Sequence, residues 1–291
     1  MSKTKYGVLV SGGLGNTCLE LIVQVSKVSF VMTDKRSDGI IAFCQEKKIP
    51  IFLGNPRNGK AAAFIANKPV DIILSINYIF IVEQDIIRHP AKYAINFHGS
   101  LLPLYRGRTP HVWAIINNEK ETGITAHLIT EGCDEGDILY QEKLPIESDY
   151  TGAHILSLFN QRYPHIVQMV MEMIENNNIR LVKQEHDKAT WFDKRTPEDG
   201  EISWNWQRER IYNWVRAQTK PYPGAFTYRG DDKIIVYKVA FCDYGFHSNM
   251  PDGLILNNNP QPIVKTPNGA VVLTDLVLPN GVVLNQGEIL K

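Results

Sequence analysis

The segment YAINFHGSLLPLYRGRTPH, residues 93–111, shows how the first half of the chain is built. It begins as an apolar strand and turns polar within a few positions, at Asn96 and His98. Open α/β sheets bind ligands at the carboxyl ends of their strands, so polar side chains at the end of an apolar run indicate a functional edge. Because successive side chains of a strand alternate between its faces, Asn96 and His98 are predicted to point the same way.

Apolar runs of this kind recur up to residue 146 and alternate with helix-like segments. Strands are expected at residues 6–11, 28–33, 49–54, 71–76, 93–97, 123–129 and 138–146, and helices at 16–26, 39–48, 60–68, 110–118 and 151–177. Runs that are apolar throughout are typical of strands covered on both faces, and the alternation predicts an α/β, Rossmann-like, mostly parallel sheet. Pro164 is expected to kink or break the last helix.

The character of the chain changes after residue 185. A linking loop is expected at 191–204 and a helix at 206–219, followed by short strands at 225–230, 233–241, 253–257, 262–266 and 270–278. Turn residues separate these strands, which predicts a small antiparallel barrel or sandwich, OB-like in type. We therefore expect a catalytic domain over residues 1–203 and a β-rich domain over residues 204–291.

Composition excludes several classes of protein. Lys plus Arg equals Asp plus Glu at 31 each and 44% of residues are hydrophobic, which favours an ordinary globular protein and argues against a polyanion-coating one. The four cysteines lie far apart with no CxxC pair, so a zinc site or disulfide framework is not expected. No signal-peptide core or long apolar span is evident. The expectation is a cytoplasmic protein that contacts no membrane.

The stretch SGGLGNTC, residues 11–18, matches part of a dinucleotide-binding pattern. Gly13 and Gly15 begin a G-x-G-x-x-G motif, and Asp34 follows at about the distance of a ribose-binding acid. Cys18 stands where the last glycine belongs, so a tight turn or a phosphate-contacting turn is the favoured interpretation. A dinucleotide site stays open as the alternative.

The segment Asn-x-His-x-Ser-Leu-Leu-Pro followed by LYRGR resembles the signature of the N10-formyltetrahydrofolate-dependent formyltransferases. The downstream stretch ETGITAHLITEGCDEGDIL, residues 121–139, is similar to the family's second motif, with Asp134 in the aspartate position. The resemblance implies that Asn96, His98 and Asp134 form the catalytic trio. It also implies that N10-formyltetrahydrofolate is the co-substrate. No metal is expected. A protein that keeps the fold but lacks catalysis is the alternative from a different class.

The residue types suit formyl transfer. Attack of an amine on the formyl carbon produces an oxyanion, which the Asn96 amide and a protonated His98 can stabilise. A carboxylate near an imidazole sets its tautomer, which is the role expected of Asp134. Whether His98 acts mainly as a base or as an oxyanion donor stays open.

The resemblance places the folate beside three loops. The predicted contacts are Ile79, Phe80, Ile81, Val82, Ser100, Leu102, Thr130, Gly132 and Asp137. Main-chain groups would read the pterin edge after residue 76, while the aromatic rings there can equally serve as core. The acidic residues of the loop at 130–137 suggest a cation site, but they lack EF-hand spacing.

The acceptor is predicted from the domain junction. RTPEDGEISW and the later PYPGAF, within residues 195–226, are similar to the sugar N-formyltransferases, which implies a nucleotide-linked amino sugar as substrate and a product for surface polysaccharide such as O-antigen. Arg106, Arg108 and Lys220 are candidate phosphate contacts, and Tyr222 is a candidate for stacking on the base. We expect a homodimer.

Two other formyl acceptors remain as alternatives. Methionyl-tRNA is the alternative, but residues 205–291 hold 9 basic and 7 acidic residues, which does not favour a nucleic-acid partner. The glycinamide ribonucleotide enzyme ranks third because it is a single, shorter domain.

Overall fold

The computed structural model describes residues 4–291, and its contacts divide the chain into two units. The first unit contains the described residues up to Gly107 together with Gly123–Leu144 and Leu158–Trp191. The second contains Arg108–Thr122, Pro145–Ser157 and Phe192–Lys291. Each unit is therefore built from separate stretches of the chain. The boundary expected after residue 203 stays a prediction.

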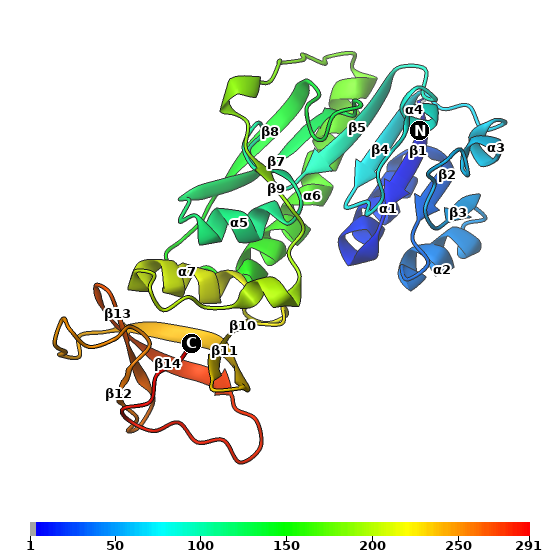
Figure 1. The fold of residues 1–291 in the computed structure, drawn as a ribbon. Coiled ribbons are helices and arrows are strands. Elements are labelled where there is room, and N and C mark those ends of the chain that lie inside the picture. Colours follow the sequence, from blue (N-terminus) through cyan, green and yellow to red (C-terminus); the bar gives the residue numbers. More distant parts are fainter. Residues whose placement is uncertain (1–3) are drawn as a thin grey trace. The chain divides into compact units, whose positions relative to one another are not determined.

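Seven strands form the sheet of the first unit, in the order β3-β2-β1-β4-β5-β7-β8 (Figure 1). Their bounds are β1 Lys5–Val10, β2 Lys27–Thr33, β3 Ile51–Leu53, β4 Ile72–Ile76, β5 Tyr93–His98, β7 Glu121–Leu128 and β8 Ile138–Pro145. The pairs from β3 to β5 are parallel, and β5 pairs antiparallel with β7. All five residues of β4 are buried, as expected for a strand covered on both faces. The predicted α/β, mostly parallel sheet is confirmed.

Helices of the first unit pack on this sheet. They are α1 Gly12–Val25, α2 Asp38–Glu46, α3 Ala62–Ile65 and α4 Gln84–Ile87. The helix α1 contacts β1, β2 and β4, while Ile65 of α3 and Ile86 of α4 join a buried cluster with Phe30. The long helix α6, Gly152–Glu175, continues through Pro164. The expected alternative of a break at Pro164 is therefore wrong.

Two very short strands hold the loop that follows β5. They are β6 Arg106–Gly107 and β9 Trp191–Phe192, which pair with each other. Arg106 donates its backbone N–H to the Thr190 carbonyl at 2.9 Å. The expected linking loop after residue 190 thus begins as a strand, and it later contains a 3₁₀ turn, Pro197–Gly200, closed by a capping box of Thr196 and Asp199.

The second unit contains a five-stranded sheet in the order β10-β11-β14-β13-β12, in which every pairing is antiparallel. The bounds are β10 Ala225–Arg229, β11 Asp232–Cys242, β12 Ile255–Asn257, β13 Ile263–Thr266 and β14 Gly269–Val277, with helices α5 Pro110–Ile116 and α7 Arg208–Ala217. The helix α7 packs on β11, β14 and α5. The expected small antiparallel β-rich domain is confirmed.

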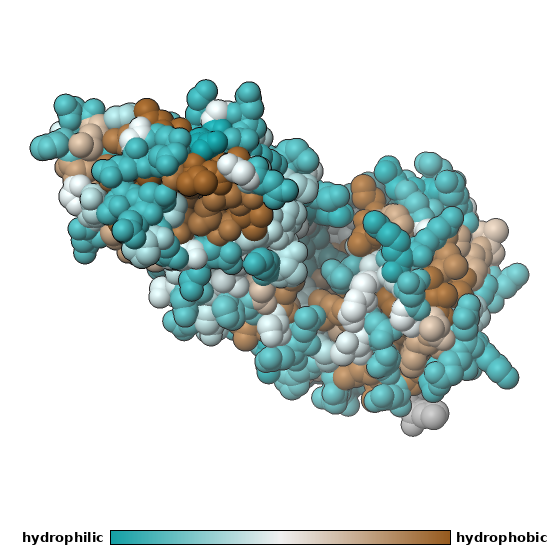
Figure 2. All heavy atoms as spheres, turned by 90° about the horizontal axis from the view of Figure 1, so that it is seen from below, coloured by the Kyte–Doolittle hydropathy of each residue, from teal (hydrophilic) through white to brown (hydrophobic). Residues whose placement is uncertain are grey.

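Some apolar side chains stay exposed in the second unit. Val277 is 53% and Val283 is 61% exposed, and Figure 2 shows apolar patches among otherwise hydrophilic side chains. No helix within residues 4–291 combines the length and the apolar character needed to cross a membrane.

Candidate active site

Strand β5 carries Asn96 and His98 to its carboxyl end. In the ladder with β7, Asn96 lies opposite His127 and His98 lies opposite Thr125. The Asn96 amide nitrogen is 3.2 Å from His127 Nε2, so the two strands bring an amide and a second imidazole together. Asn96 is half-buried and both histidines are buried. Residues opposite each other in a ladder share a face, so the register with β7 places His127 on the face that carries Asn96 and His98.

Asp134 joins these strands from the loop between β7 and β8. Its carboxylate oxygens lie 3.5 Å from His98 Nδ1 and 3.4 Å from His127 Nε2, and its side chain is 13% exposed. The backbone N–H of Gly107 donates to the same carboxylate at 2.9 Å. Asp134 adopts a φ of 54°, a left-handed conformation that is uncommon for a residue with a side chain. The structure therefore brings the predicted trio together around one carboxylate.

Burial and charge act in opposite directions on Asp134. Burial raises the pKa of the carboxyl, but the charges of His98 and His127 and the donated hydrogen bonds of His127 and Gly107 outweigh it. The net pKa of Asp134 lies well below its usual range. At neutral pH the site therefore contains a fixed carboxylate between two imidazoles.

The hydrogen bonds of His98 restrict what its ring can do. His98 Nε2 lies 2.8 Å from the Tyr105 carbonyl, which can only accept, so this nitrogen carries a hydrogen. The other nitrogen faces Asp134. Both ring nitrogens thus face acceptors, which suits a donor better than a base.

His127 was missed by the sequence analysis. Its Nδ1 lies 2.8 Å from the Leu128 carbonyl, which leaves Nε2 to accept from Asn96 or, when protonated, to donate to Asp134. One signal was available, because His127 is the only ionisable residue in the apolar run at 123–129. An imidazole in a strand that is buried on both faces needs polar partners, and the site supplies them.

The predicted folate contacts occupy three loops of the first unit. Residues 79–82 follow β4, and the side chain of Ile81 is 64% exposed. Ser100 and Leu102 are buried in the loop after β5, where the Ser100 hydroxyl donates to the Leu104 carbonyl at 2.7 Å. Thr130, Gly132 and Asp137 lie in the loop that carries Asp134. Their contact with folate stays a prediction.

Among the predicted phosphate contacts, Arg106 lies in an unexpected place. Its side chain is fully buried and bonds to Gln184, with Glu135 at 3.6 Å. A guanidinium that already has a buried acceptor and a carboxylate is a poor candidate for a substrate phosphate. Arg108 and Lys220 are exposed and therefore accessible to a phosphate, and they stay the predicted contacts. Lys220 Nζ also lies 3.4 Å from an Asp275 carboxylate oxygen.

Tyr222 lies in the second unit beside His111. The Tyr222 hydroxyl is 2.6 Å from His111 Nε2. Burial lowers the pKa of His111 to about 4 and raises the pKa of Tyr222, so both groups are neutral near pH 7. The bond fixes the tyrosine ring, and stacking on a base stays a prediction.

The glycines of residues 11–18 form part of a helix instead of an open loop. The helix α1 begins at Gly12, four residues earlier than expected, because Gly12 adopts a φ of 66° and its N–H bonds to the Ser37 hydroxyl at 2.9 Å. A Cβ on Gly15 would lie 3.0 Å from that of Val10, which explains a glycine there by close packing. Asp34 accepts from Ser37 at 2.6 Å.

The acidic side chains of the loop at 130–137 have basic neighbours. Glu131 lies 4.0 Å from Arg88 and Glu135 lies 3.6 Å from Arg106. Within the described part of the chain, no group of three or more His, Cys, Asp or Glu side chains is placed to hold a metal ion.

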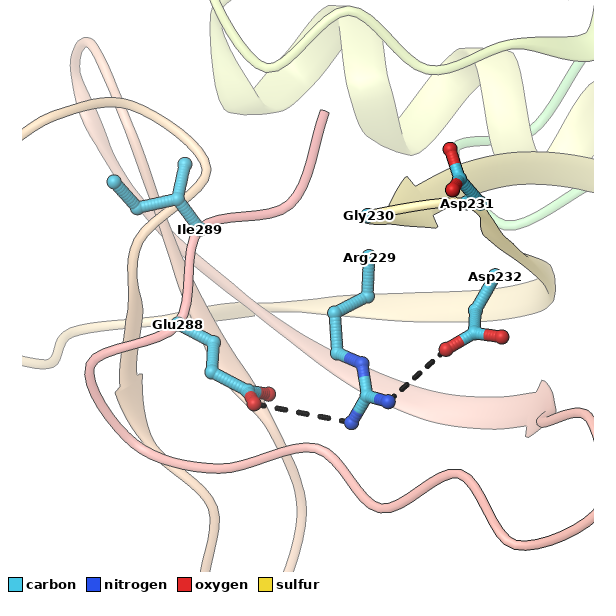
Figure 3. A pocket seen from close by; sticks show the side chains of 6 residues that line it. All are labelled: Arg229, Gly230, Asp231, Asp232, Glu288 and Ile289. Carbon is cyan, nitrogen blue, oxygen red and sulfur yellow. Dashed lines mark hydrogen bonds and ion pairs between the residues drawn. The ribbon is translucent and has the colours of Figure 1, made fainter.

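A shallow hollow of about 650 Å³ lies at the β10–β11 turn of the second unit. Figure 3 shows Arg229 there between Asp232 and Glu288, at 3.0 and 3.8 Å. Its guanidinium is already balanced by two carboxylates, and none of the predicted site residues lines this hollow.

Two protein-family models match this chain. The formyl transferase family model matches residues 19–171, and the model of the formyl transferase C-terminal domain matches residues 194–291. The chain belongs to the formyl transferase family. The family predicted from residues 96–103 and 121–139 is confirmed.

Individual relatives agree with this family. The bifunctional polymyxin resistance protein ArnA of Wigglesworthia glossinidia brevipalpis is 38% identical over 256 residues, which are 86% of this chain and 39% of that protein. The chain thus spans well under half the length of this relative.

Two solved structures share the fold. WlaRD, a sugar 3N-formyl transferase crystallised with dTDP and 5-N-formyl-THF, has a TM-score of 0.71 at 18% identity, over 96% of this chain and 99% of that one. An N-formyltransferase from Helicobacter canadensis, in complex with folinic acid and dTDP-3-aminofucose, has a TM-score of 0.71 at 19% identity, over 94% of this chain and 100% of that one.

Proposed function

We propose that this chain transfers the formyl group of N10-formyltetrahydrofolate to the amine of a nucleotide-linked amino sugar. The observation that carries the proposal is the Asp134 carboxylate within 3.5 Å of His98 and His127, beside the Asn96 amide. Such a site supplies donors for an oxyanion and partners for a proton. The names of the structural relatives and the RTPEDG and PYPGAF segments support a sugar acceptor.

The reaction needs one bond formed and one broken. The amine nitrogen attacks the formyl carbon, the carbonyl oxygen becomes an oxyanion, and the bond from that carbon to N10 of the folate then breaks. The amine loses one proton and N10 gains one. The Asn96 amide donates to the oxyanion. The His98 ring, whose two nitrogens face the Tyr105 carbonyl and Asp134, stabilises the oxyanion through its positive charge when protonated, and Asp134 favours that charge.

The two substrates would occupy different residues of the site. Folate would contact the loops at 79–82, 100–102 and 130–137. The sugar nucleotide would use Arg108, Lys220 and Tyr222, and its N-formylated product would enter a surface polysaccharide. The protein would act as a soluble homodimer in the cytoplasm.

The experiment is a competition assay. The protein is given N10-formyltetrahydrofolate carrying a labelled formyl group, together with dTDP-, UDP- and GDP-linked amino sugars and methionyl-tRNA. Label on one of the sugars is expected, and mass spectrometry of that product identifies the acceptor. Label on the tRNA and on no sugar would contradict the proposal.

Salt dependence separates the same alternatives. A sugar nucleotide presents one diphosphate, so its affinity should decline gently with salt. A tRNA acceptor would require several neutralised phosphates, and the logarithm of its affinity would fall by several units per decade of salt.

A further inference from the structure

A buried glutamine, Gln184, binds the loop that carries Asp134. Gln184 is 6% exposed, and its Nε2 donates to the Asp134 carbonyl at 2.8 Å and to the Gly136 carbonyl at 2.7 Å. The first of these two acceptors is the carbonyl of the residue whose φ is 54°. A left-handed conformation at a residue with a side chain persists only where its surroundings hold it, and Gln184 supplies such a hold.

Arg106 fixes the orientation of this glutamine. The Gln184 Oε1 accepts from Arg106 Nε at 3.2 Å and from Nη2 at 2.7 Å. A guanidinium can only donate and a carbonyl can only accept, so the amide of Gln184 has one satisfied orientation and no competing flip. The side chain therefore acts as a rigid link between Arg106 and the Asp134 loop.

Arg106 is held in turn by several partners. His186 Nδ1 lies 3.0 Å from its Nη2, Glu135 lies 3.6 Å from its Nη1, and the Trp191 ring lies 5.2 Å from the guanidinium carbon. The adjacent Gly107 N–H bonds to the Asp134 carboxylate at 2.9 Å. The Gly107 N–H thus binds the carboxylate of Asp134, and the Gln184 side chain binds its backbone carbonyl.

We propose that Gln184, oriented by Arg106, is a positioning residue that sets the distance between the Asp134 carboxylate and His98. This inference rests on the proposed formyl transfer and adds a specific determinant to it. It also explains why an arginine next to the trio is fully buried.

The main test is Gln184→Glu. This variant keeps the volume and the acceptor for Arg106, but it places an oxygen against the carbonyls of Asp134 and Gly136. We expect kcat to fall about 10-fold or more, with KM for both substrates within about 3-fold, because a displaced carboxylate harms the reaction more than binding. Gln184→Met, which removes both kinds of bond, should do the same. Gln168→Met, at an exposed glutamine of α6, is the matched control and should stay within about 2-fold.

Coupling to Asp134 separates positioning from a general loss of structure. In an Asp134→Asn background, adding Gln184→Glu should lower kcat by less than about 2-fold further, because the two changes damage the same element. Independent, multiplicative losses would overturn the proposal. So would a Gln184→Glu variant with wild-type kcat.

A second readout needs no substrate. The Gly107 amide should exchange its hydrogen about 10-fold faster in Gln184→Glu, followed by NMR, because the Asp134 carboxylate that accepts from it moves. The Gln168→Met control should exchange like the wild type. If the wild-type protein formylates no acceptor, the proposed function fails, and Gly107 exchange alone then decides the role of Gln184. Unchanged exchange would overturn it.

Discussion

The carboxyl ends of β1 and β5 lie in the same sheet and both carry motif-like segments, yet they are built differently. At the end of β1, the Ser37 hydroxyl accepts from the Gly12 N–H and donates to Asp34. A short neutral side chain from the loop after β2 thus holds the turn that leads into α1. After β5, three ionisable side chains share one location around Asp134. Glycine spacing is explained by a tight turn, whereas gathered titratable groups need a chemical reason.

The largest expected effect tests the β5 end. Asn96→Ala should lower kcat by about 100-fold or more, because it removes a donor for the oxyanion, while the melting temperature stays near that of the wild type. Steady-state kinetics and a thermal scan measure the two quantities. The matched change at the β1 end is Ser37→Ala, which should cost about 1–3 kcal/mol of stability by removing the hydroxyl that accepts from the Gly12 N–H and donates to the Asp34 carboxylate, and leave kcat within about 3-fold. Equal kcat losses at both ends would remove the contrast.

His127 sharpens the comparison by one further residue. His127→Gln should lower kcat by about 10-fold, since the glutamine amide can still meet Asn96 but cannot carry a positive charge toward Asp134. The same kinetic assay measures it, with KM recorded separately. If the variant kept the wild-type kcat, His127 would have no catalytic role, and the proposed catalytic residues would be the predicted trio alone.

The low pKa of Asp134 predicts how the free energy of unfolding changes at acidic pH. A carboxyl whose pKa is lower in the folded state contributes stability above its unfolded value, about 4, and this contribution is lost as the pH falls toward the folded value. The stability advantage of the wild type over Asp134→Asn should therefore be constant from pH 7 to about 5 and shrink below about 4. Urea unfolding across this range measures it. An advantage that does not change with pH would contradict a carboxylate stabilised by the two histidines.

The smallest expected effect is an absence of binding at the β1 end. Calorimetry with NAD and NADP should give no heat of binding at millimolar ligand, because Gly13 and Gly15 are taken up in α1 and Cys18 is buried. Micromolar affinity for either would show that this turn holds a dinucleotide after all.

Local patterns predicted the elements well. The apolar run at 71–76 became β4, and the turn-separated strands after residue 224 became the antiparallel sheet of the second unit. Both follow from interactions between near neighbours and from burial, which a sequence records directly. The start of α1 was placed four residues late because the three glycines among residues 12–15 argue against a helix by propensity, while the Gly12 turn and its bond to Ser37 favour one.

The sequence by itself determined the family, the α/β class and the alternation that sets Asn96 and His98 on one face, because these depend on residue type and a period of two. Only the tertiary structure decided that His127 joins them, since this requires the antiparallel register of β5 and β7. It also decided that Arg106 is fully buried against Gln184, 78 residues away. Contacts between residues so distant in the chain leave no local pattern, because they depend on how the sheet and its loops pack.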